Sequence, residues 1–353
     1  MDGPQPPRPS RLSWAVSAAL GVASGILLVS QGGINTRLRR DALGDSPIPT
    51  ACISFSVGLV AVAAVAATHG RLSGVRRDWS FRTAPWYAYL SGLLGPLYVV
   101  AAVLLAERLG FAAFQLCTIL GQMLVSCLLD GCGLLGLQRR RPTPLHLVAL
   151  VGLATGTVLA IEGVHDGVSD DPWWQVALFA LCATGAGSIL PIQAMVNATM
   201  AKHLRTPFRA VAFSFFMGAV VLALISGGVL AASGPLSGVR SGEAWMYTGG
   251  LCGAFFVTSN AIGIPRIGAA GYSAIFVASQ LTTAFAYDAI GAFGFDVVRP
   301  TARRVAGVLL ATASAVVYQL LPRSAQQPDS PSEEVPEAVV GLAMTTETHT
   351  YMS

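Results

Sequence analysis

Charged side chains are scarce in this sequence. Asp, Glu, Lys and Arg make up only 11% of the 353 residues, against roughly 25% in an average soluble domain. A water-soluble fold of this length would expose more surface than so few charges could cover. The net charge of +4 is small and spread over several short segments. We therefore expect no binding of nucleic acid, which needs a concentrated basic patch.

Motifs for catalysis and for metal or nucleotide binding are also missing. The sequence has no nucleophile with a placed base, no metal-ligand cluster and no Gly-rich phosphate loop. Its six cysteines lie within or beside apolar runs and suggest neither disulfides nor a metal site. We expect a protein that is not an enzyme, binds no cofactor or metal and is not an ATP-driven pump. An intramembrane enzyme acting on lipid is the least favoured class.

Apolar residues dominate instead, at 53% of the chain with a mean hydropathy of +0.61. They fall into ten charge-free runs of 18 to 30 residues, and a helix needs ~20 apolar residues to cross the hydrocarbon core of a bilayer. We predict an all-α integral membrane protein with ten transmembrane helices. The runs are 12–36, 46–68, 83–106, 109–129, 142–161, 172–201, 210–239, 244–265, 267–287 and 305–322.

The positions of Lys and Arg predict the orientation of these helices, because cytoplasmic loops are enriched in both. With the N-terminus inside, 14 basic residues lie in cytoplasmic segments and 8 outside, so both termini are expected in the cytoplasm. The loop 162–171 has four acidic residues and no basic one, and we place it outside. The Pro-rich arm 1–13 and the polar tail 323–353 are expected to be disordered cytoplasmic segments.

The chain also repeats itself. Gln122 and Asp130 return as Gln280 and Asp288 at a constant offset of 158, and blocks such as QGGIN and SFSVG return in the same order as QAMVN and SFFMG. The two halves, 14–165 and 172–322, have five helices each. Since five is odd, the second half must enter the membrane from the opposite side. Inverted repeats of this kind are common in secondary transporters, where the substrate lies near the midplane between the repeats.

These blocks resemble a known family. The segments QGGINTRL, SFSVG and GQMLVSCLLDGCGLLG, with QAMVNATM, SFFMG and SQLTTAFAYDAIGAFG in the second half, resemble the YdcZ-like family of the drug/metabolite transporter (EamA-like) superfamily. The resemblance covers residues 15–322 in a fused two-repeat form. It implies a ten-helix exporter of small molecules in the bacterial cytoplasmic membrane. The halves are not equivalent, because Glu107 stands opposite Pro265 and Ala102 opposite Asn260.

Two amide pairs are candidate substrate-binding residues. Gln31 and Asn35 are four residues apart, so they share one helix face, and the same holds for Gln193 and Asn197. With inverted repeats the two pairs lie toward opposite faces of the membrane, as a pair of gates would. Such amides can equally form interhelical hydrogen bonds that only hold the bundle together.

Three more amides lie deeper in the apolar runs. Gln122 and Gln280 fall near the middle of their runs, and we predict that they face each other across the repeat axis and line a central polar cavity. Asn260 follows Thr258 and Ser259 and gives its helix a polar stretch that could line the same cavity. Packing between helices is the alternative role, because a polar side chain in lipid needs a partner.

Two acidic residues end the helices that carry these glutamines. Asp130 and Asp288 follow Gln122 and Gln280 by eight residues, roughly 12 Å of helix rise. Proton coupling is the functional hypothesis for both. A solvated helix end followed by a Gly turn is the simpler alternative, since a charge at the membrane boundary costs little.

We predict from these patterns a secondary transporter that moves a small solute by alternating access. A non-transporting membrane scaffold or accessory subunit is the alternative. The expected partners are a small-molecule substrate and the lipid bilayer, and association into a homodimer stays open.

Overall fold

The computed structural model describes residues 10–74, 80–132, 142–165, 172–234, 236 and 242–322. The tail 323–353, most of the arm 1–13 and part of the loop 162–171 lie outside these residues, as do several of the arginines that predict orientation. Within the described residues, all the elements are helices, and each predicted run falls on one long helix. The long helices are α1 (Arg11–Arg37), α2 (Pro47–Leu72), α3 (Ser91–Leu109), α4 (Phe111–Cys132), α5 (Pro144–His165), α6 (Trp173–Leu204), α7 (Pro207–Ser233), α8 (Gly249–Ile267), α9 (Ala269–Ile290) and α10 (Ala302–Leu320).

Seven of these helices, α1 to α7, are long and apolar enough to cross a membrane. Helices α8, α9 and α10 are not apolar enough by the same measure of mean hydropathy, because Ser, Thr, Asn, Gln and Arg side chains lower it. Four short elements complete the fold: η1 (Leu38–Ala42), η2 (Trp86–Leu90), η4 (Ala244–Thr248) and η5 (Ala292–Gly294). Of these, η1 is a π-helix that extends α1.

The connections within each half end helices at corresponding places. Gly110 separates α3 from α4 with a φ of 77°, and Gly268 separates α8 from α9 with a φ of 81°. A positive φ is unfavourable for residues with a Cβ atom, so glycine allows each chain reversal.

Threonine side chains cap the starts of two helices of the second half. Thr206 and Thr301 accept hydrogen bonds from Arg209 N (3.1 Å) and Arg304 N (3.2 Å) at the starts of α7 and α10.

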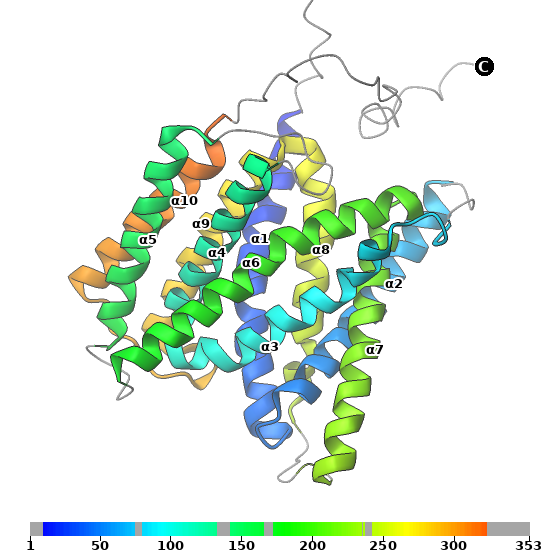
Figure 1. The fold of residues 1–353 in the computed structure, drawn as a ribbon, viewed down its shortest axis with the longest axis horizontal. Coiled ribbons are helices and arrows are strands. Elements are labelled where there is room, and N and C mark those ends of the chain that lie inside the picture. The colour runs from blue at the N-terminus through cyan, green and yellow to red at the C-terminus, as the bar shows by residue number, and fades with distance from the viewer. Residues whose placement is uncertain are drawn as a thin grey trace, which may run out of the picture.

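The two halves pack against each other in a reciprocal way (Figure 1). Helix α1 packs on α8 and α9, while its counterpart α6 packs on α3 and α4; α2 packs on α7, and α5 on α10. A Cβ atom on Gly92 would lie 2.8 Å from the Ser214 carbonyl oxygen, and one on its counterpart Gly250 would lie even closer to the Ser54 carbonyl oxygen. Small residues at helix contacts let backbones approach closely, as is usual in membrane bundles.

The reciprocity is not complete: α6 also packs on α7, whereas their counterparts α1 and α2 barely touch. Helices α1 and α3 pack together, but their counterparts α6 and α8 make little contact. Helix α1 begins and α10 ends at the same end of the bundle (Figure 1), which we call the termini end. The opposite end, where α9 ends at Ile290 and α10 begins at Ala302, is called the far end.

Candidate functional site: a cavity between the halves

A cavity of about 630 Å³ lies between α1, α3, α4, α6, α8 and α9. Its lining includes Ala269 and Ala270 at the start of α9 and Leu320 to Pro322 at the end of α10 and just beyond it, so the cavity extends to the termini end. Sites for small molecules usually have volumes of about 300–1,000 Å³. Because the cavity takes its walls from both halves, it lies at the repeat interface that the sequence predicts.

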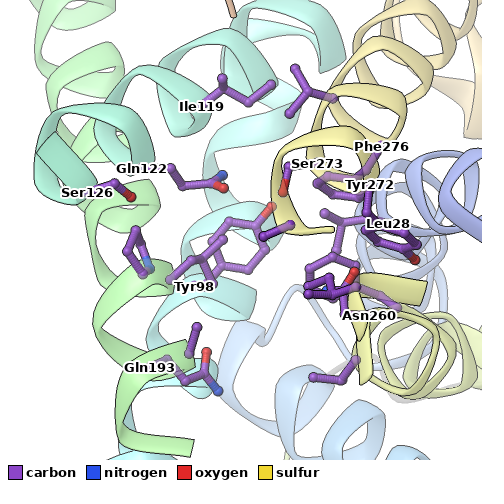
Figure 2. A pocket seen from close by; sticks show the side chains of 18 of the residues that line it. Leu28, Tyr98, Ile119, Gln122, Ser126, Gln193, Asn260, Tyr272, Ser273 and Phe276 are labelled. Atoms are coloured by element: carbon purple, nitrogen blue, oxygen red, sulfur yellow. The ribbon is translucent and has the colours of Figure 1, made fainter. Parts of the chain in front are cut away.

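Five of the predicted amide residues line this cavity. They come from α1, α4, α6 and α8, and Figure 2 shows three of them around the open space. The five are Gln31, Gln122, Gln193, Asn197 and Asn260. Gln31 and Gln193 hold equivalent places: the Nε2 atom of Gln193 lies 2.8 Å from where a Cβ on Gly95 would be, and that of Gln31 lies 2.9 Å from the Cβ position of Gly253. Each of these two glutamines thus reaches a helix of the other half.

Asn35 does not line the cavity with Gln31. It is 1% exposed, and its Nδ2 atom donates a hydrogen bond to Ser54 Oγ at 3.2 Å. It also presses on Gly249 at the start of α8, where a Cβ atom would collide with the Asn35 amide. The two amides predicted to act as one gate therefore have different surroundings, and Asn35 joins α1 to α2 and α8.

Gln280 differs from the prediction made for it. It is fully buried, and its Nε2 atom donates to Gln115 Oε1 at 2.6 Å. Gln122 and Gln280 thus do not face each other across one cavity. The reason is Gln115, which lies seven residues before Gln122 on the same face of α4 and provides an amide partner for Gln280. Ser273, the repeat counterpart of Gln115, lines the cavity with Gln122.

This contact between the halves is therefore present at one end of the bundle, and its counterpart is absent at the other. At the far end Gln280 bonds to Gln115. Toward the termini end, Gln122 and Ser273 both face the cavity (Figure 2), and the structure has no hydrogen bond between these two described residues. The cavity therefore lies between Gln122 and Ser273, and a contact between these two side chains would narrow it.

Asp288 is the centre of a buried polar cluster at the far end. It is 1% exposed, and its carboxylate accepts hydrogen bonds from the backbone N–H groups of Phe111 (2.6 Å) and Ala112 (2.8 Å) at the start of α4. The fully buried guanidinium of Arg304 pairs with it and also donates to the Val298 carbonyl at 2.9 Å. A carboxylate at a helix N-terminus satisfies N–H groups that have no partner within the helix. Asp288 is thus a clamp between α4, α9 and α10, not a solvated helix end.

Asp130, its counterpart, is half-buried near the end of α4. The structure therefore gives the two predicted coupling residues different environments.

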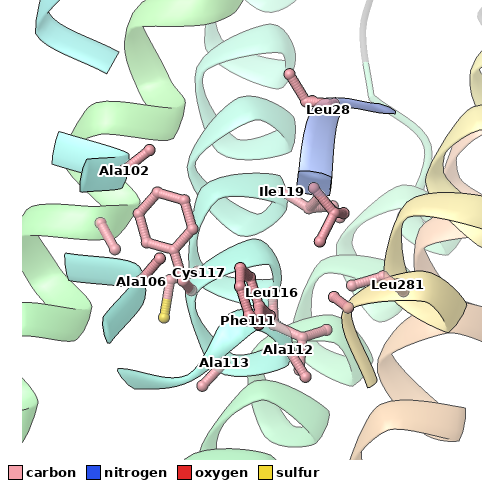
Figure 3. Close-up of a cluster of buried hydrophobic side chains, with 14 of the residues drawn as sticks. Leu28, Ala102, Ala106, Phe111, Ala112, Ala113, Leu116, Cys117, Ile119 and Leu281 are labelled. Atoms are coloured by element: carbon pink, nitrogen blue, oxygen red, sulfur yellow. The ribbon is translucent and has the colours of Figure 1, made fainter. Parts of the chain in front are cut away.

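Aromatic rings fill the far end around this clamp. The ring of Phe111 stacks on Phe295 with centroids 4.4 Å apart, and it meets Tyr287 and Phe293 edge-on. Figure 3 shows Phe111 within the buried apolar cluster. Phe293 in turn covers Gly33 of α1, where a Cβ atom would collide with its ring. None of these four aromatic residues, Phe111, Tyr287, Phe293 and Phe295, lines the cavity.

An ion-pair network adds to this closure. Arg39 in η1 is 7% exposed and donates to Glu107 Oε2 at 2.5 Å and to the Val103 carbonyl at 3.2 Å. Arg40 reaches the other oxygen of Glu107 at 3.2 Å, and Asp45 pairs with Arg39 at 2.9 Å. Glu107 therefore ties α1 and η1 to α3. Its repeat counterpart is Pro265, so the termini end lacks a carboxylate at the matching position.

Three of these residues were missed from the sequence. Gln115 has a detectable signal, because it shares a helix face with Gln122. Arg304 and Arg39 lie just outside charge-free runs, so they read as loop charges that only report orientation. Both are in fact buried and paired.

Comparisons with known proteins support the architecture. The profile of the family described as "Putative inner membrane exporter, YdcZ" matches residues 16–159 and again 178–317. A solved structure titled "Crystal structure of protein" matches with a TM-score of 0.54 and 19% identity, over 86% of this chain and 96% of that one. At this identity the likeness concerns the fold alone. Among curated proteins, no relative matches the chain.

Proposed function

We propose that this protein, which belongs to the YdcZ family of inner membrane exporters, is a secondary transporter that moves a small solute through the central cavity by alternating access. Family membership makes it a multi-pass protein of the bacterial inner membrane. One observation supports the alternating-access proposal. The cavity extends to the termini end, whereas toward the far end the two halves are in contact through the Gln280–Gln115 hydrogen bond. A transporter needs such a difference between its two ends, and a scaffold does not.

We further propose that all ten long helices span the membrane, as two inverted repeats. Helices α8, α9 and α10 are the counterparts of α3, α4 and α5, which are apolar enough to cross. The reciprocal packing of α1 on α8 and α6 on α3 supports a twofold relation between the halves. With both termini in the cytoplasm, as the distribution of basic residues predicts, the cavity opens to the cytoplasm.

The mechanism exchanges equivalent contacts between the two ends. In the present conformation the Gln280–Gln115 bond is made, and Gln122 and Ser273 face the open cavity. In the opposite conformation Gln122 meets Ser273 and α6 approaches α8, while Gln280 separates from Gln115. Each half then takes up the packing that the other half has now, so most contacts of one state have an equivalent in the other, and the energies differ where the halves differ in sequence, as at Glu107 and Pro265. Such bistability is what a transporter needs to cross between them.

The coupling role stays a proposal, and the structure favours Asp130 over Asp288 for it. The Asp288 carboxylate already accepts hydrogen bonds from two backbone N–H groups and pairs with Arg304. Protonating it would therefore leave a buried arginine without its counter-charge. Asp130 is half-buried on the side of the cavity mouth, where water reaches more easily.

Thiol labelling of repeat counterparts tests alternating access without a known substrate. In a background that lacks the six native cysteines, Gln122→Cys is expected to react with a membrane-impermeant maleimide from the cytoplasmic side only. Gln280→Cys, which is fully buried now, is expected to react from the periplasmic side only, because it lines the cavity in the opposite conformation. Inside-out and right-side-out vesicles provide the two sides.

A buried cysteine away from the cavity serves as the control for labelling of unfolded protein. Leu153→Cys, buried in α5, should stay unlabelled from both sides in folded protein and react after denaturation. A Gln280→Cys variant that folds and yet resists the reagent from both sides would overturn the proposal and favour the scaffold.

A further inference from the structure

We infer that the cavity selects uncharged solutes that combine hydrogen-bonding groups with a flat apolar body. The inference rests on the proposed function, because it takes the cavity as the substrate site. It goes further in naming the chemical class that the site accepts, and it follows from the charge, the polar groups and the apolar walls of the cavity.

The first observation is that the cavity walls carry no charge. Among the residues that line the cavity, the structure has no Asp, Glu, Lys, Arg or His side chain. Two ion pairs outside the cavity lining, Asp288 with Arg304 and Glu107 with Arg39, already have their charges matched. An ion that left water for this cavity would lose hydration and meet no opposite charge, which costs several kcal/mol. A neutral solute avoids that loss.

The second observation concerns the polar groups that replace charge. Amide side chains from five helices line the cavity, and each amide can both donate and accept hydrogen bonds. The Oδ1 atom of Asn197 is buried and has no hydrogen-bond partner among the described residues. A buried acceptor without a partner destabilises the folded protein. A solute N–H or O–H group placed at Asn197 would remove that cost.

The third observation is the aromatic character of the remaining wall. Phe55 and Phe215 are repeat counterparts, and their rings touch each other with centroids 5.1 Å apart. Phe256 and Phe276 form a second pair at 5.1 Å on the side of α8 and α9. Both pairs line the cavity, and Tyr98 faces it from α3 (Figure 2). Flat rings of this kind favour a planar or apolar solute body.

A cation is the strongest competitor, because aromatic faces attract positive charge. That attraction is smaller than the cost of dehydrating an ammonium group without a carboxylate nearby. The cavity should therefore discriminate against both signs of charge, and the test includes both.

The experiment uses probe sets whose members share an apolar body and carry a neutral, a negative or a positive polar group. They are phenylacetamide, phenylacetate and phenethylamine; indole-3-acetamide, indole-3-acetate and tryptamine; and hexanamide, hexanoate and hexylamine. Each is titrated at neutral pH against the purified full-length protein in detergent, with thermal stabilisation as the readout, because a ligand of the folded state raises the unfolding temperature. We expect amides to stabilise the protein and the charged members of each set to bind at least tenfold more weakly.

A charge introduced into the cavity provides the internal check. Gln122→Glu should reverse the preference, so that tryptamine or phenethylamine binds at least tenfold more tightly than to the wild type. Gln175→Glu, at the first turn of α6 and outside the cavity lining, carries the same change of charge and should leave the preference unaltered.

Three results would overturn the inference: equal or tighter binding of a charged member to the wild type, no stabilisation by any of the probes, or no change of preference in Gln122→Glu. Flux of the probes in proteoliposomes separates this inference from the proposed function. Flux of a charged probe alone would contradict the solute class and keep the transporter. Binding of amides without any flux would keep the class and contradict the transporter.

Discussion

Replacing Asp288 by Asn is expected to lower the free energy of unfolding by about 3–5 kcal/mol, the usual effect of removing one partner from a buried ion pair. The substitution leaves the fully buried guanidinium of Arg304 without a counter-charge. It also weakens the hydrogen bonds that Phe111 N and Ala112 N donate at the start of α4. Unfolding of the purified protein by a denaturing detergent, followed by tryptophan fluorescence, would measure the change.

Two variants control this experiment. Asp288→Asn combined with Arg304→Met should recover much of the lost stability, because it removes the unpaired charge together with its partner. Asp130→Asn makes the same change at the half-buried counterpart and should cost less. An Asp288→Asn protein as stable as the wild type would show that the clamp contributes little. A loss of transport in Asp288→Asn would by itself say nothing about proton coupling, since the fold is affected first.

Gly25 is the position where added volume should be least tolerated in α1. A Cβ atom there would lie 2.7 Å from the backbone nitrogen of Gln280 and 2.8 Å from the carbonyl oxygen of Phe276. Backbone atoms of α9 cannot move aside as a flexible side chain can. We expect Gly25→Ala to cost about 1–3 kcal/mol, as overpacking usually does, and Gly25→Leu to give no monodisperse protein on gel filtration.

Gly32 is a matched control on the same helix, because a Cβ atom there would meet nothing within 4 Å. Gly32→Ala should leave stability unchanged or raise it by up to about 1 kcal/mol, through the higher helix propensity of alanine. Equal tolerance of Gly25→Leu and Gly32→Leu would mean that α1 and α9 are not packed as closely as the structure has them.

The sequence predicts the helices of this protein well, because lipid imposes a simple condition on them. A segment that crosses the hydrocarbon core must be apolar over about 20 residues and must satisfy its backbone internally. Each charge-free run is accordingly found on one long helix. The repeat predicts which helices are counterparts, and the reciprocal packing of Gly92 and Gly250 agrees with it.

The candidate site was predicted only in part, and Gln122 and Gln280 show why. Both sit at equivalent positions, and a repeated sequence gives no sign of which of the two counterparts lines the cavity. The structure has one conformation, so it separates the counterparts: Gln122 faces the cavity and Gln280 bonds to Gln115. Arg304 was missed for a different reason. Counting charges to find loops assumes that an arginine at a helix end is solvated, and Arg304 is fully buried.

Glu107 in the first half has Pro265 as its counterpart in the second, and this difference affects which step of the proposed transport cycle is slow. Only the far end can form the pairs with Arg39 and Arg40. Hydrogen bonds to charged groups contribute about 1.5–3 kcal/mol each, and 1.4 kcal/mol corresponds to about a tenfold difference in population. Without solute, the proposed transporter would therefore dwell mostly with its cavity toward the cytoplasm. Loading would begin there, and the slow step of each cycle would be the breaking of these pairs, as suits a protein that carries solute outward.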